Sequence, residues 1–188
     1  MPTIDENENA KFSYFKLKLN WEKPKFVQMV KEDDGYVETG EFSGMQGKVV
    51  SVERDYYEYR WDETKQAIVI FEWKDGYEKV TMNFTIPVAF MLINSFAGVD
   101  KIDTAKIKTY MSEDKEWNKH PALYVEVNWE KGNLKYNLTE LWEKGQEETK
   151  ELMWKELEKL NEKVVNDMDK DFDTEEEWVE DVDDDLPF

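Results

Sequence analysis

The stretch Gln66–Ile86, QAIVIFEWKDGYEKVTMNFTI, decides the fold class of this chain. Two runs rich in β-branched and aromatic residues flank Asp75-Gly76, a dipeptide typical of the two-residue turn of a β-hairpin. Alternation along both runs predicts a core face with Val69, Phe71, Trp73, Val80, Met82 and Phe84. The other face then carries Ile70, Glu72, Lys74, Tyr77, Lys79 and Thr81. We expect Glu72 to lie opposite Lys79 across this hairpin.

Strand patterns also precede the hairpin. Residues 12–19 alternate apolar side chains with lysines and predict a first strand. Residues 31–47 contain two adjacent aspartates and four glycines, which predict a loop or a short irregular strand. Residues 48–61 predict a long strand, and a change in apolar phase near Arg54-Asp55 predicts a bulge there.

After the hairpin, the pattern changes to a short helix and then returns to strands. Pro87 is suited to open an apolar helix over residues 88–96, and Gly98 is suited to end it. Further strands are predicted at 104–111 and 122–129, with a return strand at 134–137. This order is that of an OB-fold, a five-stranded partly open barrel. We therefore predict a mainly β chain in which residues 1–140 form an OB-fold, with the short helix between strands three and four.

Residues 141–168 show a helical period. The apolar residues recur at spacings of three and four and form one stripe, made of Met153, Leu157, Leu160, Val164 and Met168. We expect this C-terminal helix to pack against the barrel. The alternative is that the stripe forms the seam of a homodimer.

The last segment, residues 169–188, is strongly acidic. It holds 11 Asp or Glu and the single basic residue Lys170, a net charge of −10. Such a segment buries too little apolar surface to offset the entropy of ordering, so we expect it to be disordered. Nevertheless it ends in Leu186-Pro187-Phe188, and a terminal Phe with a free carboxylate is suited to dock into an apolar pocket lined by basic residues.

The final six residues, Asp183-Asp184-Asp185-Leu186-Pro187-Phe188, resemble the C-terminal tip of bacterial single-stranded DNA-binding proteins, which ends in Asp-Asp-Asp-Ile-Pro-Phe. The resemblance covers six of 188 residues. It implies an OB-fold that coats single strands and a tip that recruits replication, recombination and repair proteins. In that family a Gly-, Gln- or Pro-rich linker precedes the tip. The helix predicted here instead suggests a divergent version from a phage or mobile element.

Charge and composition limit the remaining classes. The net charge is −19, of which residues 1–142 contribute −6, so more than half of the excess lies in the tail. Cysteine is absent, which excludes disulfides and thiolate metal sites and favours a reducing compartment. No apolar run approaches the ~18 to 20 residues that span a bilayer. We expect a cytoplasmic protein, located in the bacterial cell or, if a phage encodes it, in the cytoplasm of the host.

Aromatic rings interleaved with cations indicate where a single strand would bind, because bases stack on rings while cations follow the phosphates. Residues 54–61 hold two arginines and four aromatic rings. Lysines and tyrosines on the outer side of the hairpin and of strand 104–111 extend this surface, and Trp117 lies in a polar loop beyond it. The predicted contacts are Arg54, Tyr56, Tyr59, Arg60, Trp61, Lys74, Tyr77, Lys79, Lys106, Lys108, Tyr110 and Trp117.

Two other classes of function stay open. Glu72 and Lys74, with Asp62 upstream, resemble the metal-binding core of Mg-dependent nucleases. The acidic charge also fits a protein that imitates DNA or serves as an adaptor. The single His120 has no second His or Cys to complete a zinc site, and we expect no cofactor. The sequence favours a non-enzymatic single-stranded DNA-binding protein over both alternatives.

Overall fold

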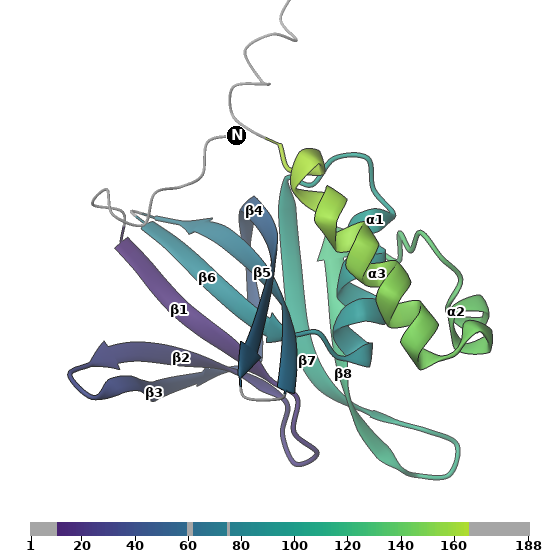
Figure 1. Ribbon diagram of the computed structural model, residues 1–188, viewed down its shortest axis with the longest axis horizontal. Helices are drawn as coiled ribbons and strands as arrows, with labels where there is room; N and C mark the ends of the chain where they lie inside the picture. The colour runs from purple at the N-terminus through teal and green to yellow at the C-terminus, as the bar shows by residue number, and fades with distance from the viewer. Residues whose placement is uncertain (1–10, 60–61, 75, 166–188) are drawn as a thin grey trace, which may run out of the picture.

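The structure is a computed structural model that describes residues 11–59, 62–74 and 76–165. These residues form one nine-stranded sheet, with helices packed against part of it (Figure 1). The predicted mainly β class is therefore confirmed. The acidic tail that we expect to be disordered lies outside the described residues. Within the described ranges, no helix has the length and apolarity needed to cross a bilayer.

The sheet contains one parallel pair of strands, β1 with β6, and its other neighbours are antiparallel. The order across the sheet is β3-β2-β1-β6-β5-β4-β7-β8-β9. The strands are β1 (Lys11–Lys18), β2 (Lys25–Glu32), β3 (Gly35–Phe42), β4 (Gly44–Tyr59), β5 (Asp62–Trp73), β6 (Gly76–Asn83), β7 (Thr104–Glu113), β8 (Lys119–Val127) and β9 (Glu130–Lys131).

This open nine-stranded sheet differs from the five-stranded, partly open barrel that the sequence predicts. Two features enlarge it. Residues 31–47 contribute to the β2–β3 hairpin and to the start of β4, where we predicted a loop or a short irregular strand. In addition, β1 joins β6 in parallel, which places the β1–β2–β3 segment at one end of the sheet instead of closing a barrel.

The β5–β6 hairpin forms as predicted, with its turn one residue earlier. Trp73 lies opposite Gly76, and Lys74 at the turn adopts a positive φ of 43°. Glu72 consequently lies opposite Tyr77 and not opposite Lys79, and Trp73 is exposed at 48% instead of buried. Gly76 is needed in the strand, because a Cβ there would lie 2.4 Å from the carbonyl oxygen of Lys11 on β1.

The long strand β4 bends at a bulge between Val49 and Ser51, not near Arg54-Asp55 as predicted. The bulge lies where β4 changes neighbours. Its pairing with β7 ends at Lys48, and beyond the bulge the Asn161 side chain accepts a hydrogen bond of 3.0 Å from the Val52 backbone N–H. This end of α3 thereby satisfies part of the strand edge that β7 leaves open.

The helical segments are η1 (Val88–Ile93, a π-helix), α1 (Asn94–Ala97), α2 (Leu138–Lys144), α3 (Gln146–Leu160) and η2 (Asn161–Lys163, a 3₁₀-helix). η1 and α1 occupy the predicted helix, with Gly98 as its C-cap. The predicted C-terminal helix starts earlier and is interrupted at Gly145, whose φ is 88°. The predicted return strand at 134–137 is irregular, and the short β9 precedes it.

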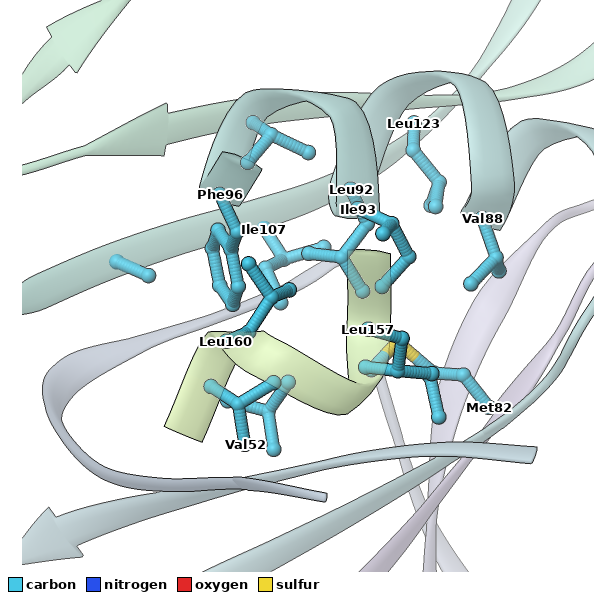
Figure 2. Packing of buried hydrophobic residues seen from close by; sticks show 14 of the residues in the cluster. Val52, Met82, Val88, Leu92, Ile93, Phe96, Ile107, Leu123, Leu157 and Leu160 are labelled. Atoms are coloured by element: carbon cyan, nitrogen blue, oxygen red, sulfur yellow. The ribbon is translucent and has the colours of Figure 1, made fainter. Parts of the chain in front are cut away.

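The apolar stripe of α3 packs against the sheet and against η1 and α1, which supports the first of the two roles that we predicted for it. Met153, Leu157 and Leu160 are each at most 1% exposed. Burial of one such side chain contributes roughly 1.5 to 3 kcal/mol to folding. Met168 lies outside the described residues. Figure 2 shows Leu157 and Leu160 among core residues that include Val52, Met82, Val88, Ile93, Phe96, Ile107 and Leu123.

Candidate nucleic-acid interface

The sheet has a second face, on the side opposite to α3, which we term the outer face. Strand alternation and register define it, because its residues alternate with the core residues Val69, Val80 and Ile107. One row crosses five neighbouring strands and consists of Phe12, Tyr77, Glu72, Lys48 and Thr104. Further outer-face positions are Tyr14, Lys79 and Ile70 on β1, β6 and β5, and Lys106, Lys108 and Tyr110 on β7.

Four aromatic rings contact one another on this face, and we term them the aromatic platform. The ring centroid of Phe12 lies 5.4 Å from that of Tyr77 and 6.2 Å from that of Tyr14. Tyr14 in turn lies 6.0 Å from Tyr36 on β3, which is 55% exposed. Lys79 is the register neighbour of Tyr14. Partly exposed rings beside a cation are the arrangement on which unstacked bases bind.

The predicted β7 residues share the outer face. Lys106, Lys108 and Tyr110 alternate with residues that are buried, and Tyr110 is 46% exposed. Lys108 is exposed and lies opposite Tyr124 on β8. Lys106 is 3.4 Å from a carboxylate oxygen of Glu126. The cations of this face are therefore partly neutralised by neighbouring acids.

The outer face also carries the pair Lys48 and Glu72, whose charged atoms are 3.4 Å apart. Glu72 belongs to the set predicted for a nuclease, together with Asp62 and Lys74. Lys74 lies in the hairpin turn, where its Nζ is 5.7 Å from the Trp73 ring, and the Asp62 side chain is outside the described part. Among the described residues, no group of three or more His, Asp or Glu is arranged to hold a metal ion.

Arg54 lies on the α3 side of the sheet. Its guanidinium donates a 2.6 Å hydrogen bond to Glu158 and lies 5.4 Å from the Trp154 ring centroid. These contacts tie β4 to α3 and orient Arg54 away from the outer face.

Tyr56 lies on the same side as Arg54 and is 46% exposed. Its hydroxyl donates a 3.0 Å hydrogen bond to Glu58, and this bond, with desolvation and the nearby Glu63, raises the pKa of Tyr56 to about 12. Tyr59 ends β4, and its side chain lies outside the described residues, as do Arg60 and Trp61. Of the contacts predicted within 54–61, the described Arg54 and Tyr56 therefore lie on the other side of the sheet from those of β6 and β7.

Trp117 lies in the turn of the β7–β8 hairpin, where it is 81% exposed with a positive φ of 64°. The Asp114 carboxylate holds this turn by accepting hydrogen bonds from the backbone N–H groups of Asn118 (2.9 Å) and Glu116 (2.8 Å). His120 Nε2 lies 3.2 Å from Asp114 Oδ2. The bonds from Asn118, with that from His120, lower the pKa of Asp114 to about 2.

The sequence interpretation missed three residues of the platform: Phe12, Tyr14 and Tyr36. The alternation over residues 12–19 already placed Phe12 and Tyr14 on one side of a strand. This alternation does not predict the parallel pairing of β1 with β6. That pairing brings Phe12 next to Tyr77, which is distant in sequence. Searches with protein-family models, among curated proteins and among solved structures found no match to this chain.

Proposed function

We propose that this chain is a non-enzymatic cytoplasmic protein that binds single-stranded DNA with little sequence preference. The observation that carries the proposal is the aromatic platform, four touching rings beside lysines on the outer face. The acidic tip, residues 183–188, supports a second role in recruiting replication and recombination proteins. Neither role requires an OB-fold, because the face of an open sheet also offers rings and cations to a strand.

The platform supplies the two interactions that sequence-independent binding needs. Stacking of a base on an aromatic ring contributes about 1 to 3 kcal/mol, and every base has a face that can stack. Lysines beside the rings attract the phosphates in a salt-dependent way. Stacking accounts for the lack of preference for a DNA sequence. The exposed ring of Tyr36 gives a DNA single strand access to the edge of the platform.

A second candidate is an acidic protein that imitates DNA or acts as an adaptor. The net charge of −19 favours it, as do the acids that neutralise Lys48 and Lys106 on the outer face. This candidate predicts no affinity for single strands. It predicts instead that basic DNA-binding proteins bind the chain and that DNA competes with them.

The test is fluorescence anisotropy of a labelled oligo-dT at low salt, with duplex DNA of equal length as the competitor. We expect Tyr36→Ala and Tyr77→Ala each to weaken binding about 5-fold to 100-fold, the loss of one stacked base. Tyr56→Ala is the matched control, since it removes an exposed tyrosine from the α3 side.

The outcomes separate the candidate functions. Affinity for oligo-dT that depends on Tyr36 and Tyr77 and not on Tyr56 supports the proposal. No binding by either the full chain or a chain without residues 169–188 favours the acidic mimic. Cleavage of the oligonucleotide after addition of Mg²⁺ supports the nuclease.

A further inference from the structure

A shallow hollow of about 140 Å³ lies at the outer face, where the start of β4 meets β7. Two lysines from β7 line it together with the first residues of β4; the lining residues are Ser43, Gly44, Met45, Gln46, Lys106 and Lys108. Lys106 and Lys108 point to the same side because they are two residues apart on one strand. Two cationic side chains thus line the same hollow.

Gly44 keeps this hollow open. It lies opposite Lys108 in the β4–β7 register. A Cβ at this position would be 2.9 Å from both Lys108 Cγ and the carbonyl oxygen of Ile107. Any larger residue would therefore displace the Lys108 side chain from its present position.

The Glu126 carboxylate lies beside these lysines. It is 3.4 Å from Lys106 Nζ and accepts a 2.5 Å hydrogen bond from the Tyr124 hydroxyl. The Tyr124 bond and the charges of Lys106 and Lys108 hold the pKa of Glu126 below its usual value, so the carboxylate is ionised at neutral pH. At 3.4 Å this ion pair is longer than the roughly 2.7 to 2.9 Å typical of a charge-assisted hydrogen bond, so a phosphate oxygen at that shorter distance from Lys106 would be a stronger partner.

We infer that Lys106 and Lys108 form a phosphate-binding subsite, and that Glu126 holds Lys106 until a phosphate group replaces the carboxylate. The inference rests on the proposed function, since the phosphate that it expects is a phosphodiester of a bound single strand. The subsite extends the interface from the aromatic platform to β7. Glu126 is then an internal competitor: its carboxylate must leave Lys106 before a phosphate can bind there, and this lowers the affinity for a single strand.

The first test uses the salt dependence of oligo-dT binding. Each phosphate contact with a single strand contributes about 0.7 to the slope of log K against log salt concentration. We expect the double variant Lys106→Gln/Lys108→Gln to lower the slope by about 1.4. Lys155→Gln, an exposed lysine on α3, removes a charge on the other side of the sheet and should leave the slope unchanged.

The second test addresses Glu126. Glu126→Gln frees Lys106 without adding a base, so we expect tighter oligo-dT binding, whereas the number of phosphate contacts and therefore the slope stay the same. Glu143→Gln on α2 makes the same change in net charge at an exposed site away from the lysines. An equal gain in both variants would show a general charge effect and overturn the role of Glu126.

The subsite and the proposed function fail in distinguishable ways. If the native chain binds oligo-dT and the double lysine variant keeps its salt slope, the subsite is refuted and the proposed function stands. If the native chain does not bind oligo-dT, the proposed function fails. Titration with inorganic phosphate at constant ionic strength, followed by amide NMR, then decides the subsite. Saturable shifts at Gly44 and Lys108 that vanish in the double variant support it, and their absence overturns it.

Discussion

At the scale of single residues, the face of the sheet decides what a cation or an aromatic ring does. Arg54 and Lys108 have one feature in common, since each lies on a predicted strand two residues before a tyrosine. In the structure, Arg54 bonds to Glu158 on α3, whereas Lys108 is exposed on the outer face. Alternation predicts which residues share a side, but it does not predict which side a helix covers.

Arg54→Ala should therefore affect stability and not binding. The variant loses the ion pair with Glu158 and the contact with the Trp154 ring, both partly exposed. We expect the free energy of unfolding to fall by about 0.5 to 1.5 kcal/mol. Urea denaturation measures this loss, and oligo-dT anisotropy should give an unchanged Kd. A loss of affinity comparable to that of Tyr36→Ala or Tyr77→Ala would place Arg54 in the interface after all.

Asp114 makes the Trp117 turn sensitive to acid. Its folded-state pKa of about 2 lies below the value of ~3.9 expected in an unfolded chain. The contribution of Asp114 to stability is thus complete above pH ~3.9 and is lost as the pH falls through the folded pKa. We expect the amide signal of Asn118 to titrate with a midpoint near 2 in NMR spectra. Asp114→Asn should abolish that transition, and a midpoint near 4 would contradict the hydrogen bonding described.

At the scale of elements, local sequence patterns predicted the helices and strands and the pairing of strands that are close in sequence. They did not predict the pairing of strands that are far apart in sequence. The β5–β6 hairpin, the helix before Gly98 and strands β1, β7 and β8 were all foreseen, because turn chemistry and period act over a few residues. The parallel β1–β6 pair, and with it the platform, depends on contacts that no local pattern encodes.

Glu156 shows how one element is held in place. It is 7% exposed on α3, and it accepts hydrogen bonds from Lys135 Nζ (2.9 Å) and from the Tyr136 hydroxyl (2.8 Å). The buried Asn94 fixes the same segment through two bonds of 2.9 Å with the Tyr136 backbone. These bonds connect α3, α1 and the segment after β9 into one polar network.

Glu156→Ala should consequently be more destabilising than other substitutions of acids on α3. It leaves the Tyr136 hydroxyl and the Lys135 charge without their acceptor, which we expect to cost about 1 to 3 kcal/mol. Glu151→Ala, at an exposed position of the same helix, should change the stability by less than about 0.5 kcal/mol. Urea unfolding of both variants provides the comparison, and equal stabilities would show that the network contributes nothing.

At the scale of the whole molecule, charge is divided unevenly between the sheet domain and the tail. Residues 169–188 carry −10 of the net −19, while the outer face holds lysines that are already partly neutralised by acids. The proposed function implies that two sources of negative charge compete with DNA for the same lysines, one within the sheet and one in the tail. The first is tested by Glu126→Gln, and the second requires truncation.

Deleting residues 169–188 should tighten binding to oligo-dT, because it removes 11 acids that compete with the phosphates. The gain should be severalfold at low salt and should shrink as salt rises, since the screening length is only about 10 Å at 0.1 M. Phe188→Ala is the matched control: it alters the docking tip and keeps all of the charge, so it should leave the Kd for oligo-dT unchanged. Anisotropy titrations of the three proteins at two salt concentrations measure the effect. Competition by the tail is refuted if the truncated chain binds oligo-dT with unchanged or weaker affinity. If Phe188→Ala gains as much affinity as the truncation, the effect belongs to the tip and not to charge.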